Sequence, residues 1–253
     1  MLTKITTSIL VILALAPLSF GEDLPAKSSI PEASKGVSIP QDKGYVVEEI
    51  RDGLYWITDG VYQSMFMTTG KGVIVVDAPP SFGEKLMKAI RDVTKEPIAY
   101  VVYSHSHADH IGGAYVFPET AKFVAQKNTK TRLEDMNDPK RPFPFGLFVG
   151  GKTVPMPTII FDKSYTIKLG TQILKLDYLG DDHEPGNIYI YAPKHKVLMK
   201  IDIIFPGWSP FESLAIAENI NKCPVPWSGH HDTFSSFSYT YPLCSSIILS
   251  RIA

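Results

Sequence analysis

The sequence feature that most constrains this chain is an apolar run that ends in closely spaced histidines. Residues 98–104, "IAYVVYS", are typical of a buried strand, and the next six residues are "HSHADH", which contain His105, His107, Asp109 and His110. In an extended segment alternate residues point the same way, so His105 and His107 offer their imidazoles to one cation. Asp109 and His110 then turn toward an adjacent position as the chain bends. The pattern predicts a metal site, and it is compatible with two neighbouring metals.

The ligand types narrow the choice of metal. Imidazole and carboxylate suit zinc, and also iron or manganese, and no cysteine lies near the cluster to favour a thiolate site. Gly112 and Gly113 are expected to let the backbone pass close beneath the site and to start a helix. The alternative is a polar surface loop whose histidines bind metal only by accident. The apolar strand ahead of it and the spaced aspartate argue against that alternative.

Two later segments offer further ligands. His183 lies in "YLGDDHEPGNIYIY", on a tight connection between two expected strands. The alternative is an ordinary surface residue, which is the more common case for a single loop histidine taken alone. Asp202 lies in "VLMKIDIIFPGW", where an isolated carboxylate in an apolar strand is costly to bury unless it is paired or coordinated. Coordination of a metal explains both residues. The alternative for Asp202 is a pairing with Lys200 or with a backbone amide.

The hydrophobic pattern alternates between strands and helices. A helix is expected at 81–95, with Ser81 as a candidate cap, and a polar helix at 127–137, followed by a Pro- and Gly-rich surface loop at 138–157. A hairpin is expected around Asp59-Gly60. Strands are expected at 53–58, 61–69, 72–77, 98–104, 121–126, 165–169, 171–180, 187–193 and 196–205. The order of strand, helix and strand predicts an α/β layer architecture with a mostly buried sheet.

The first residues read as an export signal. Residues 1–21 contain one lysine, Lys4, an apolar stretch from Ile9 to Leu15 and small residues before Glu22, which is the layout of a secretory signal peptide. The stretch is too short, and too soon broken by Pro17, to serve as a stable membrane anchor. Residues 22–44 are expected to be a flexible leader, with folding from about Tyr45. The protein is therefore expected to be secreted or periplasmic.

Composition restricts the partners. The 253 residues include 25 basic and 26 acidic residues without a clustered basic run, so nothing indicates binding to nucleic acid. A hydrophobic share of 44% provides an ample core for one or two domains. A small-molecule substrate is the expected partner, and the oligomeric state stays open.

Three segments together resemble the metallo-β-lactamase-fold hydrolases. "HSHADH" matches that family's His-x-His-x-Asp-His motif, "DDHEPGN" is similar to its second-histidine turn, commonly His-Thr-Pro-Gly-Asn, and "KIDIIFPG" resembles the strand with its bridging aspartate. The resemblance covers about residues 45–218 and implies a four-layer αβ/βα sandwich with a metal centre at one edge of two facing sheets. It also implies the ligands: His105, His107 and His183 for one metal, Asp109 and His110 for the second, and Asp202 as the bridge.

The resemblance implies hydrolysis of an ester, lactone, thioester or amide by metal-activated water, with one or two zinc ions and with Asp109 as a catalytic proton carrier. Aspartate at position 202, where the commonest lactamases have cysteine, is the pattern of glyoxalase-like and lactonase-like members. One alternative is a single-iron thiol or persulfide dioxygenase of the same fold. The other is an inactive binding protein with an incomplete metal site.

Residues 219–253 depart from the family pattern. This tail is serine-rich and poor in charge, with no amphipathic helix of the kind that closes the fold, and is therefore expected to be atypical. His230 or His231 in "SGHHD" is the candidate for the family's last metal histidine. Cys223 and Cys244 form one disulfide or stay as two thiols. If the tail replaces the usual ending, we expect a weak second metal and an exposed sheet edge that favours aggregation.

Overall fold

The computed structural model describes residues 36–136, 153–203, 237–241 and 246–251, all within one compact unit, Pro31–Ala253. The expected signal peptide and most of the expected loop at 138–157 therefore lie outside the described residues. Within the described part, no helix has the length and apolar character needed to cross a membrane.

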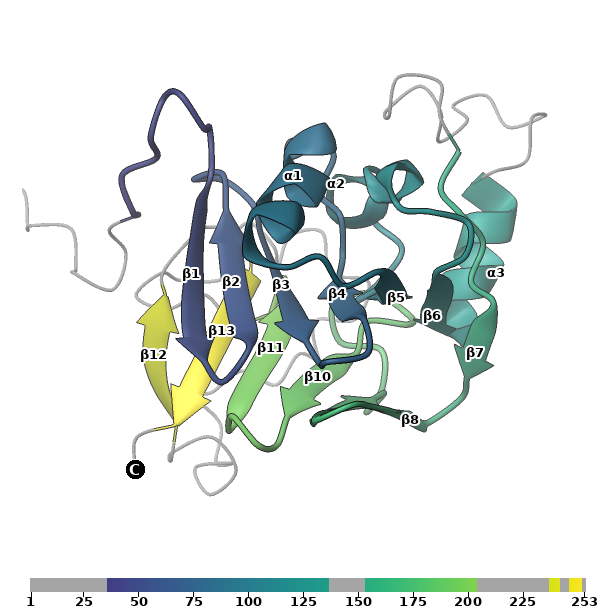
Figure 1. Ribbon diagram of the computed structural model, residues 1–253. Coiled ribbons are helices and arrows are strands. Elements are labelled where there is room, and N and C mark those ends of the chain that lie inside the picture. Colours follow the sequence, from purple (N-terminus) through teal and green to yellow (C-terminus); the bar gives the residue numbers. More distant parts are fainter. Residues whose placement is uncertain (1–35, 137–152, 204–236, 242–245, 252–253) are drawn as a thin grey trace, which may run out of the picture. The chain divides into compact units, whose positions relative to one another are not determined.

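A seven-stranded sheet follows the order of the sequence (Figure 1). Its strands are β1 (Val46–Arg51), β2 (Leu54–Thr58), β3 (Gln63–Thr68), β4 (Val73–Val76), β5 (Ile98–Val102), β6 (Lys122–Gln126) and β7 (Ile159–Phe161). Strands β1 to β4 pair antiparallel, and β4 to β7 pair parallel. Parallel neighbours need long crossovers. These contain the described helices: α1 (Glu84–Val93), α2 (Ala108–Ile111), the short η2 (Ala114–Val116) and α3 (Lys127–Met136).

The expected hairpin is present as β2 and β3, which pair antiparallel from Leu54 opposite Met67 to Thr58 opposite Gln63. Its connection is four residues long, 59–62, and not the two-residue turn that Asp-Gly favours. The Asp59 carboxylate accepts the backbone N–H groups of Val61 and Tyr62, at 3.0 and 2.8 Å. The side chain thus adds two hydrogen bonds to the backbone bond from Asp59 N–H to the Tyr62 carbonyl, at 3.3 Å.

Helix α1 confirms the amphipathic pattern but not the predicted cap. It begins at Glu84, its N-cap is Gly83 with a φ of 51°, and no side chain caps it. Ser81 is therefore not the cap, because the chain turns through the left-handed region at a glycine, which carries no Cβ penalty there. Leu86 and Ile90 are buried on the face toward the sheet.

A second sheet has six strands in the order β12-β13-β11-β10-β9-β8, all antiparallel. Their bounds are Ser164–Leu169 (β8), Gln172–Asp177 (β9), Tyr189–Ala192 (β10), Val197–Ile201 (β11), Phe237–Tyr241 (β12) and Ser246–Arg251 (β13). Strand β13 pairs along the whole of β11, so β11 is not the exposed edge that the tail was expected to leave (Figure 1). The resemblance implies a closing helix, but the short apolar run in "SIILSR" forms a strand.

Strand β4 shows how the layers pack. Successive side chains of a strand point to opposite faces, and both faces of "VIVV" are buried. Val73 and Val75 join an apolar core with residues of the helices, such as Leu86 of α1, Ile111 of α2 and Leu133 of α3. Ile74 and Val76 join a second core with residues of the other sheet, among them Leu176, Ile190 and Met199. The two sheets therefore face each other, and the described helices cover the outer face of the seven-stranded sheet.

Candidate metal centre

The first ligands lie between β5 and α2. Helix α2 begins at Ala108 and contains Asp109 and His110. Gly112 ends this helix, contrary to expectation, whereas Gly113 precedes the short helix η2 as its N-cap. The predicted close approach of the backbone is present at Gly113, whose N–H donates to the Ala78 carbonyl at 2.8 Å. A Cβ on Gly113 would lie 2.7 Å from that carbonyl oxygen. The glycine therefore lets the ligand segment lie directly against the loop after β4.

The later ligands come from the second sheet. His183 lies in the connection between β9 and β10, where the backbone turns at Gly186 with a φ of 105°. The sequence predicted Asp202 within a strand, but the residue directly follows β11. Its φ is 59°. The left-handed conformation is unusual for a residue with a side chain, and aspartate tolerates it better than most. It marks the point where the chain leaves the sheet at the site.

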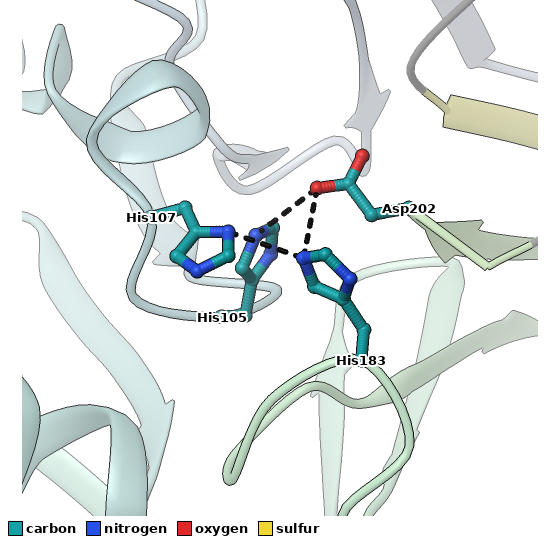
Figure 2. A group of neighbouring side chains, drawn as sticks. All are labelled: His105, His107, His183 and Asp202. Carbon is teal, nitrogen blue, oxygen red and sulfur yellow. Dashed lines mark hydrogen bonds and ion pairs between the residues drawn. The ribbon is translucent and has the colours of Figure 1, made fainter. Parts of the chain in front are cut away.

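Four side chains converge on one point (Figure 2). One ligand atom from each lies within 4.8 Å of the others, and the residues are His105, His107, His183 and Asp202. His183 Nε2 lies 3.1 Å from His107 Nδ1. Asp202 Oδ2 lies 3.4 Å from His105 Nε2 and 3.4 Å from His183 Nε2. Three imidazoles and one carboxylate thus lie close enough together to hold a single cation.

Asp109 and His110 adjoin this group on the side of Asp202. His110 Nε2 lies 3.1 Å from Asp202 Oδ2 and 3.6 Å from Asp109 Oδ2. Asp202 Oδ2 is therefore shared between the four-residue group and the pair. Tyr62, which no sequence motif marks, donates its hydroxyl to Asp109 Oδ2 at 3.1 Å and packs edge-on against His110.

The buried nitrogens fit a bound metal. His105 Nε2, both ring nitrogens of His110 and His183 Nδ1 are buried without a hydrogen-bond partner. The other ring nitrogen of His105, Nδ1, contacts Ser104 Oγ at 2.8 Å, so Nε2 is the atom left for the cluster. Buried polar atoms without a partner are costly, and a cation in the cluster would supply a partner for His105 Nε2 and His110 Nε2, the two of these atoms that face Asp202. Nitrogen and carboxylate oxygen donors are a set that zinc accepts.

Burial and charge separate the protonation states of the site. Burial lowers the pKa of His105 to about 4, so its ring is neutral and able to donate a lone pair. Burial also acts to lower the pKa of His110, but the charge of Asp202 outweighs it and raises that pKa to about 9. Burial opposes ionisation of Asp202, yet His110 and His105 hold its pKa well below the usual range. In the metal-free chain Asp202 is thus ionised and His110 protonated at neutral pH.

A buried carboxylate that the sequence patterns did not mark lies behind His107. Glu184 is 1% exposed, and its Oε2 lies 3.2 Å from His107 Nε2. Its Oε1 accepts the backbone N–H and the hydroxyl of Ser106, at 2.6 and 2.8 Å. Burial would raise the pKa of Glu184, but pairing with His107 outweighs it and lowers the pKa to about 2. The sequence signal for Glu184 was its charge directly after His183. The family motif that this segment resembles commonly has threonine at that position.

A second buried charge supports the His183 turn. The Lys200 side chain is fully buried, and its Nζ lies 2.8 Å from Asp182 Oδ2 and 3.0 Å from Asn187 Oδ1. Lys200 therefore pairs with Asp182 next to His183, and not with Asp202, which was the alternative to coordination. The pair connects β11 to the turn that carries His183.

Four candidate residues of the tail, His230, His231, Cys223 and Cys244, lie outside the described residues.

The site and the facing sheets agree with the comparison of the sequence with known families. The profile of the metallo-beta-lactamase superfamily matches residues 57–240. The chain belongs to this superfamily, whose members are metal-dependent hydrolases. The predicted metallo-β-lactamase fold is thereby confirmed. Of its four layers, the described residues form the two sheets and one layer of helices.

Several curated proteins are similar to parts of the chain. The alpha subunit of 2,4-dinitroanisole O-demethylase from Nocardioides sp. (strain JS1661) is 24% identical over 63% of this chain and 46% of its own length. Metallo-beta-lactamase type 2 from Elizabethkingia meningoseptica is 26% identical over 64% of this chain and 63% of its own. Human acyl-coenzyme A thioesterase MBLAC2 is 24% identical over 71% of this chain and 74% of its own length. The chain thus spans less than two thirds of the length of the first two relatives.

Among solved structures, that of metallo-beta-lactamase IND-7 aligns with 61% of this chain and 69% of its own, at 25% identity and a TM-score of 0.49. The structure of a metallo-beta-lactamase from Pontibacter korlensis aligns with 61% of this chain and 69% of its own, at 21% identity and a TM-score of 0.47.

Proposed function

We propose that this protein is an exported hydrolase that uses one or two zinc ions and water to cleave an ester, lactone, thioester or amide bond in a small molecule. The observation that supports this most is the convergence of His105, His107, His183 and Asp202, whose ligand atoms lie within 4.8 Å of one another. Export rests on the signal-like residues 1–21, and a small neutral substrate rests on the balanced charge of the chain.

In the proposal the first metal is held by the three histidines His105, His107 and His183. Asp109 and His110 hold a second metal, and Asp202 serves both. When bound, such a metal supplies Lewis acidity and makes water nucleophilic near neutral pH. The chain's own residues fix the donors, since burial keeps His105 neutral and the neighbouring histidines keep Asp202 ionised. The Asp109 side chain is half exposed, so its carboxylate is open to the substrate side, where it returns a proton to the leaving atom.

The relatives support a hydrolase without fixing the bond. The named activities of three of them are an O-demethylase, a beta-lactamase and an acyl-coenzyme A thioesterase. Aspartate at position 202, and not cysteine, favours ester, lactone or thioester cleavage over lactam cleavage. A panel with one substrate of each bond type is therefore the appropriate first assay.

The test removes ligands one at a time. We expect His105→Ala and His183→Ala each to remove bound zinc and activity while the chain stays folded, because these ligands serve the site more than the core. Metal content by mass spectrometry and turnover on the panel are the measurements. His195→Gln is the matched control, since His195 contacts Gln172 at 2.8 Å, outside the cluster.

Three results would contradict the proposal. Full metal content and wild-type turnover in either alanine variant would remove that residue from the site. One iron per chain with oxygen uptake would indicate the dioxygenase. Weak metal retention without turnover would indicate a binding protein.

A further inference from the structure

We propose that Glu184 is a positioning residue, which fixes the His107 ring with Nδ1 toward the metal and makes it a stronger donor. The inference rests on the proposed metal centre and adds to it a residue that is not itself a ligand. It follows from three features of Glu184: its contact with His107, its anchoring by Ser106, and its place between the two ligand segments.

The contact with His107 decides which ring nitrogen carries the proton. Glu184 Oε2 lies 3.2 Å from His107 Nε2, and a carboxylate oxygen accepts but does not donate. In the neutral ring this ion-pair contact favours the proton on Nε2. Nδ1 is left with its lone pair, and this is the atom that faces His183 Nε2 at 3.1 Å inside the cluster (Figure 2). A carboxylate on the far nitrogen of a metal histidine orients the ring and raises its basicity.

The carboxylate is itself held in place. Both donors of Ser106, the backbone N–H and the hydroxyl, bind Oε1 at 2.6 and 2.8 Å. The Arg132 guanidinium of α3 lies 3.5 Å from Oε2 and balances its charge. With one oxygen held by Ser106, the other lies between His107 Nε2 and the Arg132 guanidinium. Glu184 thus behaves as a rigid support and not as a mobile surface acid.

Glu184 also connects two ligand segments. Ser106 lies between His105 and His107, and Glu184 directly follows His183. The bonds from Ser106 to Glu184 therefore join the loop after β5 to the turn before β10, close to three ligands. A backbone bond from Ile188 N–H to the Ser104 carbonyl, at 3.0 Å, joins the same two segments. The separation of the histidines is thereby set before any metal binds.

The experiment separates the charge of Glu184 from its shape. Glu184→Gln keeps an oxygen for Ser106 but removes the negative charge beside His107. We expect zinc to bind about 10- to 100-fold more weakly, the usual effect of losing such a partner. Competition with a chromophoric chelator measures the affinity, and the visible spectrum of the cobalt-loaded chain should shift because one imidazole donates less. The melting temperature of the metal-free chain should fall as well, because the buried contacts of Glu184 with His107 and Arg132 lose their charge, so zinc affinity and the cobalt spectrum are the deciding measurements.

Two further variants complete the design. Glu134→Gln is the matched control, because Glu134 pairs with Lys130 on the surface of α3, and zinc affinity should not change. Ser106→Ala keeps the charge but removes one of two donors to Oε1, so it should weaken zinc binding less than Glu184→Gln. If Glu184→Gln fails to fold, Ser106→Ala decides: weaker zinc binding supports the inference, and unchanged binding overturns it.

The possible failures are distinguishable. If the wild-type chain binds zinc tightly and Glu184→Gln binds it within about twofold, the inference fails and the proposed function stands. The inference also fails if only the melting temperature of the metal-free chain falls, because Glu184 is then structural. If the wild-type chain binds no zinc, the proposed function fails and the inference fails with it.

Discussion

At the scale of single residues, Asp202 has the largest number of roles in the site. Its Oδ2 lies 3.1 Å from His110 Nε2 and 3.4 Å from the Nε2 atoms of His105 and His183. One carboxylate oxygen therefore neighbours the rings of both proposed metal positions. Without a metal, its charge is balanced by the proton on His110, whose pKa is raised to about 9. Metal and proton thus compete at this site.

Asp202→Asn tests that competition. Asparagine also tolerates the left-handed backbone at position 202, so the variant changes charge and keeps shape. We expect zinc affinity to fall. The pKa of His110 should fall as well, because the neighbouring negative charge is lost. A smaller fraction of His110 is then protonated at pH 7. Zinc uptake by the variant should therefore release fewer protons than the roughly one proton that His110 releases in the wild type. Calorimetry in buffers of different ionisation enthalpy measures this release.

The exposed Asp92, which pairs with Lys88 on α1, provides the control as Asp92→Asn. Equal zinc affinity and equal proton release in Asp202→Asn and the wild type would show that Asp202 is a structural carboxylate only.

At the scale of elements, the buried pair of Lys200 and Asp182 joins β11 to the His183 turn. We expect Lys200→Met to lower the free energy of unfolding by about 3–5 kcal/mol, because it leaves Asp182 charged and buried without its lysine. Chemical denaturation of the metal-free chain measures the loss. Lys175→Met, on an exposed position of β9, is the control and should change stability by less than about 0.5 kcal/mol. A similar loss in both variants would contradict a special role for the pair.

The elements found from the sequence are those with a strong local pattern. The apolar runs of β4 and β5, the periodic face of α1 and the spacing of "HSHADH" are local, and the structure places each where the pattern predicted. Strand β1 was missed because "VVEEIR" has charged residues in its middle, and β7 because it has three residues. Glu184 and Tyr62 were missed because their partners lie 78 and 47 residues away in the sequence. The charge at position 184 was visible in the sequence, but contacts between residues so far apart could not be read from it.

At the scale of the whole compact unit, the ligands come from both sheets. His105 and His107 follow β5 of the seven-stranded sheet, and His183 and Asp202 adjoin strands of the other. A bound metal therefore cross-links the two sheets. We expect zinc at 100 times its dissociation constant to stabilise the fold by about 2.7 kcal/mol, and a chelator to reverse the gain. Thermal unfolding at several free zinc concentrations measures it, and a melting temperature independent of zinc would contradict the cross-link.

The placement of the ligands on two sheets also bears on the path of folding. His105 and Asp202 are far apart in the sequence and adjoin different sheets, so we expect them to meet only after both sheets have formed and packed. Contacts made this late are largely absent from the transition state, so strengthening them changes the rate of unfolding more than the rate of folding. A bound cation is therefore expected to slow unfolding and to leave the rate of folding nearly unchanged. It prolongs the lifetime of the native state once that state has been reached.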